Sequence, residues 1–350
     1  MASLVRFRYG LPGCSPPCTD RTGTSQPSGT FTSRLSTVRS PSPLLDITTT
    51  ATGLLCWRDS HPLEWQLASL HGHWRRIEIA KHRLFYSLVR FRLPVKTRGE
   101  DPDGLAFDFL ADDPAVSPNI PAVMTGHTNG VITINIAEAD DAERERRRRE
   151  MGEPYRTLLG HFRHEVAHYY WTLIVSSPVT LDEFRSIFGD ERADYGPALQ
   201  RYYKSGAPAD WPEHFITAYA TAHPWEDFAE TWAHYFHIVD TLETAAWFGL
   251  VVAPKISRSV AARIDFDPYR ADMDRLIEAW IPLTFAANSL NRSMGLPDLY
   301  PFVLSPPVIT KLAFVHACIH AKAGRQENMN AGLRATIAGL RARTGIGTQA

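Results

Sequence analysis

Cysteine is scarce in this chain of 350 residues, and four cysteines do not make a disulfide framework in a protein of this length. No stretch has the unbroken apolar length of a membrane span. The first residues also lack the long apolar core and small-residue cleavage site of a secretory signal. These absences predict a reduced, cytoplasmic protein with no membrane partner.

Neither sign of charge is in large excess, because the chain has 37 lysines and arginines and 38 aspartates and glutamates, for a net charge of −1. One arginine run, residues 146–149, could suggest a nucleic-acid patch. Glu143 and Glu145 flank it at helical spacing, which favours a solvated, ion-paired helix surface. We therefore expect no nucleic-acid partner.

Acidic residues and sustained apolar periodicity are both nearly absent from residues 1–55, where serine, threonine, proline and glycine dominate. Such a composition buries too little apolar surface to offset the entropy of ordering the chain. We therefore expect a poorly ordered segment over residues 1–55 and one folded domain over residues 56–350. With 44% hydrophobic residues, the chain has the composition of an ordinary globular protein.

What the chain does contain is His164-Glu165-x-x-His168, the spacing of a zinc hydrolase. Histidines at i and i+4 stand one turn apart on one face of a helix, so both rings can reach one ion. Glu165 leans towards the same face, where a carboxylate can accept a proton from a zinc-activated water. The competing interpretation is a buried amphipathic helix whose histidines are hydrogen-bonded core residues.

The motif has this meaning only on a helix, and the surrounding pattern predicts one. Gly152-Glu153-Pro154 indicates a helix start with proline at the first position, and Ser176-Ser177-Pro178 indicates its end. Between them, apolar residues recur at three- and four-residue spacing: Leu158, Leu159, Phe162, Val166, Tyr169 and Tyr170.

A third ligand would decide between the two interpretations. The metzincin pattern is excluded, because Trp171 and Ile174 stand where it requires glycine and histidine. A second helix, predicted from Pro224, carries Glu226 and Glu230 on one face. Two carboxylates facing a core are costly without an opposing cation. We favour Glu226 as the zinc ligand and Glu230 as the acceptor for a ligand histidine's N–H, with Glu230 as the alternative ligand.

The string Glu-Asp-Phe-Ala-Glu at residues 226–230 resembles the ligand helix of glutamate-zincins, including the anthrax lethal factor type. In that type, a tyrosine seven residues before the ligand helps to stabilise the oxyanion. Tyr219 stands at the matching position. The resemblance thus implies a catalytic role for Tyr219, and an ordinary buried aromatic is the alternative.

From about Lys81 to the early three-hundreds, the chain resembles a bacterial family of predicted zinc-binding metallopeptidases. The matching strings are residues 106–110, 134–141, 189–192, 240–244 and 291–297, together with the Glu226 helix. The resemblance implies a zincin-like peptidase. Family members carry a cysteine-rich zinc ribbon near the N-terminus, where this chain has only Cys14, Cys18 and Cys56. Residues 1–55 therefore resemble a degenerate remnant of that ribbon, without its four ligands.

Strand and helix signals complete the expected fold. Asn129-Gly130 predicts a hairpin between residues 122–125 and 131–136. By analogy with zincins, the strand at 131–136 would border the cleft and offer an open edge to an extended substrate. Apolar stripes predict a covering layer of helices at residues 271–290, 307–323 and 331–344. The expected class is α+β, mostly helical: a zincin-like domain with a small sheet and a C-terminal helical layer.

These observations predict a zinc metallopeptidase. His164, His168 and Glu226 would hold Zn²⁺, Glu165 would act as the base, and a peptide or protein would be the substrate. The alternative is a catalytically silent zinc-binding interaction protein with the same fold. The intact Glu165 favours the enzyme, because a purely structural site needs no general base.

Overall fold

The computed structural model describes residues 6–8, 64–98, 100–110, 125–150, 157–255 and 261–322. Apart from strand β1 (Arg6–Arg8), the segment expected to be poorly ordered lies outside the described residues. The helix expected at 331–344 also lies outside them. Both expectations therefore stay predictions.

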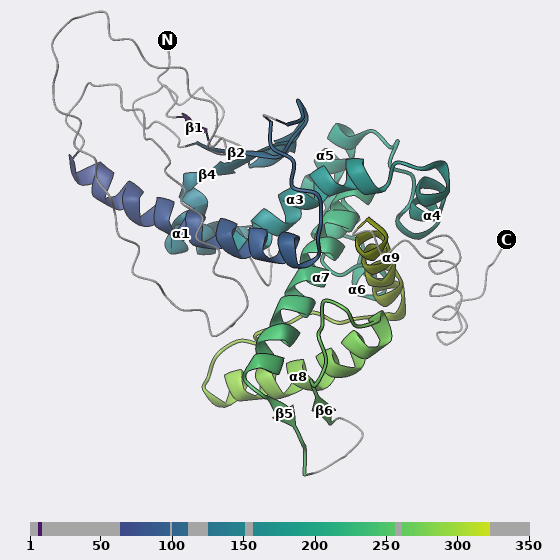
Figure 1. The fold of residues 1–350 in the computed structure, drawn as a ribbon. Coiled ribbons are helices and arrows are strands. Elements are labelled where there is room, and N and C mark those ends of the chain that lie inside the picture. Colours follow the sequence, from purple (N-terminus) through teal and green to yellow (C-terminus); the bar gives the residue numbers. More distant parts are fainter. Residues whose placement is uncertain are drawn as a thin grey trace, which may run out of the picture.

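Helices dominate the described part of the chain (Figure 1). The α-helices are α1 (Glu64–Arg90), α2 (Asp141–Glu150), α3 (Leu158–Ile174), α4 (Pro178–Phe188), α5 (Tyr195–Ser205), α6 (Trp211–His214), α7 (Pro224–Trp247), α8 (Met273–Ser293) and α9 (Pro306–Lys322). Two short 3₁₀-helices are η1 (Ile136–Ala139) and η2 (Tyr219–Thr221). The remaining strands are β2 (Ala106–Leu110), β3 (Gly126–Thr128), β4 (Val131–Asn135), β5 (Val251–Val252) and β6 (Ala262–Arg263). The class is α+β, mostly helical with small sheets.

The larger sheet has the strand order β1-β2-β4-β3, with β4 parallel to β2 and antiparallel to β3. Asn129 and Gly130 make the predicted turn, and both have positive φ, of 47° and 76°. A Cβ atom on Gly130 would lie 2.3 Å from the Asp103 carbonyl oxygen, so only glycine fits there. The expectation that residues 131–136 offer an open edge is wrong, because β4 is paired on both sides. β3 is the outermost described strand on that side.

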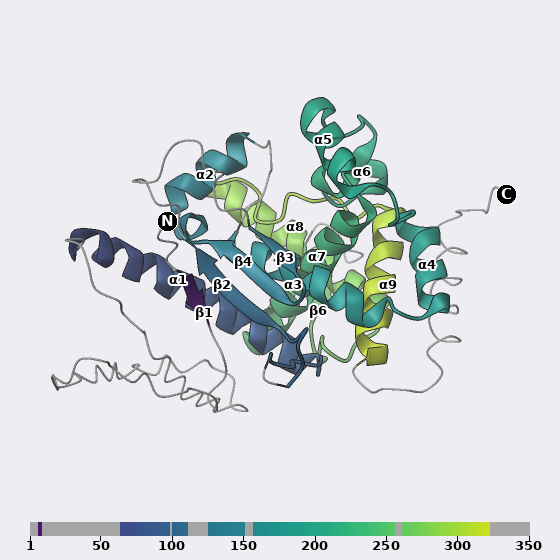
Figure 2. The same cartoon turned by 90° about the horizontal axis from the view of Figure 1, so that it is seen from above.

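The larger sheet lies over α1 and α3 (Figure 2), and aromatic side chains join it to these helices. Phe107 and Phe109 of β2 lie 5.8 Å and 6.1 Å from Phe162 of α3, between ring centroids. Phe107 also lies 5.8 Å from Phe85 of α1. The sheet therefore holds α3, the helix that carries the histidine motif, in a fixed position over α1.

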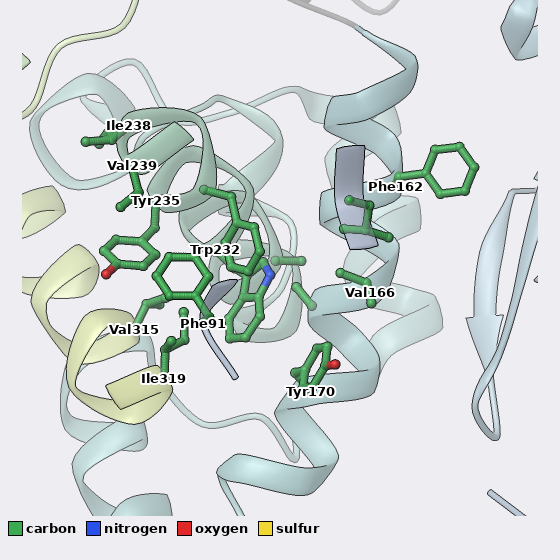
Figure 3. Packing of buried hydrophobic residues seen from close by; sticks show 14 of the residues in the cluster. Phe91, Phe162, Val166, Tyr170, Trp232, Tyr235, Ile238, Val239, Val315 and Ile319 are labelled. Carbon is green, nitrogen blue, oxygen red and sulfur yellow. The ribbon is translucent and has the colours of Figure 1, made fainter. Parts of the chain in front are cut away.

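Helix α7 runs through the centre of the molecule, and its apolar face forms the core against α3 and α9 (Figure 3). Trp232 is fully buried, and its ring stacks on Tyr170 of α3 at 5.4 Å and on Phe236 at 5.0 Å. Val315 and Ile319 of α9 are also fully buried in this cluster. Burying such side chains contributes about 1.5–3 kcal/mol each, so the register of α7 against α3 is strongly fixed.

The expected C-terminal layer is present for two of its three helices, α8 and α9. Met273, Leu276 and Trp280 on α8 are buried. Within the described residues, we find no helix whose length and apolarity would allow it to span a bilayer.

Candidate metal centre

Helix α3 presents the two histidines of the motif to the interior. It begins later than the sequence indicates, at Leu158 rather than at Pro154, because the Thr157 hydroxyl caps it by accepting from the Gly160 N–H at 3.0 Å. One helical turn separates His164 from His168, and their ring centroids lie 5.0 Å apart. The two Nε2 atoms face each other at 3.3 Å.

Helix α7 brings the third group to these rings. It begins at Pro224, as predicted, and the His223 ring caps it by accepting from the Trp225 N–H. Glu226, which is 1% exposed, places one carboxylate oxygen 3.0 Å from His164 Nε2 and the other 3.5 Å from His168 Nε2. One ligand atom from each of His164, His168 and Glu226 lies within 4.8 Å of the others, a grouping that can hold a metal ion.

Glu230 lies on the other side of the His164 ring. Its carboxylate is 2.6 Å from His164 Nδ1, and the Thr217 hydroxyl donates to its second oxygen at 2.8 Å. The two glutamates thus occupy different ring nitrogens of one histidine. Glu230 accepts the N–H of Nδ1, an arrangement that turns Nε2 towards the centre.

Glu165 is buried beside the centre, with 9% of its surface exposed. Burial raises the pKa of its carboxyl to about 7, while the charge of His164 opposes this rise. Unlike Glu226 and Glu230, it has no hydrogen bond or ion pair to any described residue. Its carboxylate is therefore not committed to a structural partner.

The protonation of the histidines follows from their partners. Burial alone would lower the pKa of His164, but hydrogen bonds to Glu226 and Glu230 outweigh burial and hold this pKa well above its ordinary value. Burial lowers the pKa of His168 to about 4. Burial would raise the pKa of Glu226, yet the two histidines hold it below its ordinary value.

This donor set fits a zinc ion. With its Nδ1 proton bound by Glu230, His164 would offer the lone pair of Nε2 once an ion displaces the proton from that atom, and three electron-rich atoms would then converge. A dication satisfies all three at once. Two imidazole nitrogens and one carboxylate oxygen are ligands that zinc prefers, and they leave a fourth position for water or substrate.

Two tyrosines stand next to these residues. The ring of Tyr219, in η2, lies 6.0 Å from that of His164, and burial followed by the charge of Glu226 raises the pKa of its phenol. Tyr195 of α5 donates to a Glu226 oxygen at 2.7 Å. Sequence reasoning missed Tyr195 and Thr217. For Tyr195 a signal existed, since the family-like string 189–192 ends three residues before it.

Other acidic residues and histidines of the chain have partners away from the candidate centre or beside it. Glu191 pairs with Arg185 and Asp190 with Arg192. His223 caps α7, as described above. His161, one turn before His164, has its Nδ1 atom 3.4 Å from the buried carboxylate of Glu138.

Two histidines and a glutamate on neighbouring helices, beside a glutamate without a partner among the described residues, form a candidate metal centre with the ligand types of zinc hydrolases. Comparison of the whole chain agrees with this class. The chain belongs to the family described as "Putative zinc-binding metallo-peptidase", which matches residues 71–318.

Relatives at 48% identity occur in Mycobacterium bovis and in two strains of Mycobacterium tuberculosis. Each alignment spans 246 residues, which is 70% of this chain and 69% of the relative. These relatives are named only as uncharacterized proteins. No solved structure matches the chain.

Proposed function

We propose that this protein is a zinc-dependent peptidase with a zincin-like fold, in which His164, His168 and Glu226 hold the metal ion. The observation that carries the proposal is the convergence of these three side chains beside Glu165, a carboxylate that has no hydrogen-bond or ion-pair partner among the described residues. Family membership supports the same conclusion.

When bound, zinc supplies a Lewis acid that polarises a carbonyl group and lowers the pKa of water from about 15.7 towards about 7. Glu165 accepts the proton of the attacking water on its carboxylate and delivers it to the leaving nitrogen. Glu230 holds His164 by its Nδ1–H and so keeps Nε2 directed to the centre. Tyr219 donates its phenol proton in a hydrogen bond to the developing oxyanion, the role that its resemblance implies.

An extended peptide would lie along β3, the outermost described strand on the side of the histidines. His127 of β3 lies 6.2 Å from Tyr169, between ring centroids, and Tyr169 directly follows His168. A peptide that pairs with a sheet edge gains main-chain hydrogen bonds independent of its sequence. Such pairing would put the substrate backbone next to the centre, whereas β4 is already paired on both sides.

The alternative is a zinc-binding protein without catalysis. A centre that only holds a metal gains nothing from a buried carboxylate without a partner, because burying it costs free energy. Glu165 is such a carboxylate, so the enzyme is the better-supported function.

Glu165→Gln tests the proposal, because the amide keeps the shape of the side chain but cannot accept the proton. We expect unchanged zinc content by elemental analysis and a loss of peptide-library hydrolysis of about 10²–10⁴-fold. Glu213→Gln, at an exposed position on α6, is the matched control and should leave both unchanged. Hydrolysis at the wild-type rate by Glu165→Gln would rule out this base, and a wild type that binds zinc but cleaves no peptide would favour the silent alternative.

A further inference from the structure

Tyr195 has no place in the mechanism above, yet its hydroxyl makes the closest contact to Glu226. It is the first residue of α5 and donates to Glu226 Oε1 at 2.7 Å, which is nearer than either histidine comes to that carboxylate. We propose that Tyr195 is a positioning residue for the metal centre, whose phenol sets the orientation of the Glu226 carboxylate. This inference rests on the proposed function, since it takes Glu226 as a ligand.

The Tyr195 hydrogen bond fixes which oxygen of the Glu226 carboxylate faces which histidine. Oε2 faces His164 Nε2 at 3.0 Å, whereas Oε1 accepts from the Tyr195 hydroxyl at 2.7 Å and lies 3.5 Å from His168 Nε2. A carboxylate that is free to rotate can exchange its oxygens or move out of the centre. With Oε1 held by a donor, the carboxylate keeps Oε2 at His164 and Oε1 at His168, and less rotational entropy is lost when a metal ion binds.

Tyr195 is fixed in the same frame as the ligand it holds. His223 accepts the Trp225 N–H at Nδ1, so its proton is on Nε2, and this proton is donated to the Ala193 carbonyl at 3.0 Å. The residue that caps α7 therefore ties down the chain just before α5. The Tyr195 ring also packs edge-on against His223 at 5.2 Å. Phenol and carboxylate are thus both placed by the first turn of α7.

Burial of apolar surface does not explain the placement of Tyr195. Ala198 is the one buried residue of α5, and Tyr195 itself is 37% exposed. The acceptor of its hydroxyl is a carboxylate with 1% exposure, which has little access to water and therefore needs donors from the protein.

The choice of donor suits a centre that must accept a dication. A hydroxyl satisfies one carboxylate oxygen without adding a positive charge that would repel the ion, as an arginine would. Glu230 is held in the same way, because its second oxygen accepts from the Thr217 hydroxyl. Both glutamates of the centre are therefore held by neutral donors.

Tyr195→Phe removes only the hydroxyl, and Tyr203→Phe removes one from an exposed position on the same helix, as the matched control. We expect the zinc dissociation constant, measured by competition with a chromophoric chelator, to rise about 10- to 100-fold in Tyr195→Phe and to stay unchanged in Tyr203→Phe. With excess chelator, Tyr203→Phe should unfold at the wild-type temperature and Tyr195→Phe within about 2–4 °C of it, the shift expected for the loss of one hydrogen bond. At saturating zinc, kcat should return to near the wild-type value, because the phenol acts through Glu226 and does not touch the substrate.

A wild-type dissociation constant in Tyr195→Phe would overturn the positioning role and leave the proposed function intact. A loss of kcat that persists at saturating zinc would also overturn it, because it would show direct contact with the reacting groups. A wild-type protein that binds no zinc would overturn both the role and the proposed function. Zinc binding without peptide cleavage would contradict the hydrolase alone, since the affinity comparison still decides the role of Tyr195.

Discussion

Helix α7 directs two pairs of carboxylates towards its neighbours, and the two pairs are neutralised in different ways. Glu226 and Glu230, near its start, meet two histidine rings and two hydroxyl groups. Asp240 and Glu243, near its end, meet two arginines. Among the described residues, no lysine or arginine pairs with the first pair.

The second pair is complete without any added ion. Arg163 of α3 donates to Asp240, which also accepts from Ser87 and from Tyr269. The Arg90 guanidinium donates twice to Glu243, at 2.7 Å and 3.0 Å. Each of the two carboxylates therefore has an arginine as partner, with Arg90 also 3.2 Å from Asp267, and this region joins α1, α3 and α7.

The comparison shows what a purely structural solution looks like in this molecule. An arginine is always protonated and therefore has no lone pair with which to bind a metal ion. A histidine can be neutral and then offers a lone pair to a metal ion. Arg163 and His164 are consecutive residues of α3, and they mark the boundary between the structural region and the metal centre.

Breaking the arginine region, formed by Arg90, Arg163, Asp240 and Glu243, should have the largest effect on the free energy of unfolding. Arg163→Met leaves the Asp240 carboxylate without its cation, and we expect a loss of about 3–5 kcal/mol in the free energy of unfolding. Urea unfolding with zinc chelated measures it, and Asp240→Asn added to Arg163→Met should recover part of the loss. Arg292→Met, which breaks the exposed pair with Asp298, is the control and should cost less than about 1 kcal/mol. If Arg163→Met also cost less than about 1 kcal/mol, the distinction between the arginine region and an exposed ion pair would be refuted.

Zinc should stabilise the folded protein only through the histidine region, formed by His164, His168, Glu226 and Glu230. At a free concentration about 100 times its dissociation constant, zinc should raise the free energy of unfolding by about 2.7 kcal/mol. His168→Ala should abolish this rise in a thermal-shift measurement with and without chelator, whereas folded Arg163→Met should retain it. Persistence of the rise in His168→Ala would place the zinc elsewhere.

Exchanging each glutamate of the first pair for glutamine separates ligand from supporting residue. Glu226→Gln should lose most zinc affinity, because the carboxylate between the two Nε2 atoms is gone. Glu230→Gln should weaken affinity by about 10- to 100-fold, since it disturbs only the hydrogen bond at His164 Nδ1. Competition titration gives both values, and the reverse order would make Glu230 the ligand.

The smallest expected effect comes from Thr217, which donates to the supporting residue Glu230 and not to the ligand Glu226. Thr217→Val removes the hydroxyl that donates to Glu230, and we expect a loss of about 1 kcal/mol in the free energy of unfolding. Thr241→Val, on the exposed side of α7, should change it by less than this. Equal effects in chemical unfolding would show that the Thr217 hydroxyl does not stabilise the centre.

Local rules in the sequence were enough to predict several features correctly. The i,i+4 spacing puts His164 and His168 on one helical turn, the Asn129-Gly130 pair makes the tight turn, and Pro224 begins α7. Each depends on the geometry of a few consecutive residues. The start of α3 was predicted wrongly, because proline marks possible starts, whereas here the hydroxyl of Thr157 provides the cap.

The tertiary structure decided how the helices meet. Glu226 and Glu230 share one face of α7, so periodicity cannot distinguish them. The register of α7 against α3, fixed by contacts such as Trp232 on Tyr170, places Glu226 at Nε2 and Glu230 at Nδ1 of His164. Tyr195 reaches Glu226 from 31 residues away, and Arg163 reaches Asp240 from 77. Spacing along the chain specifies which face a residue occupies, but only packing specifies what that face meets.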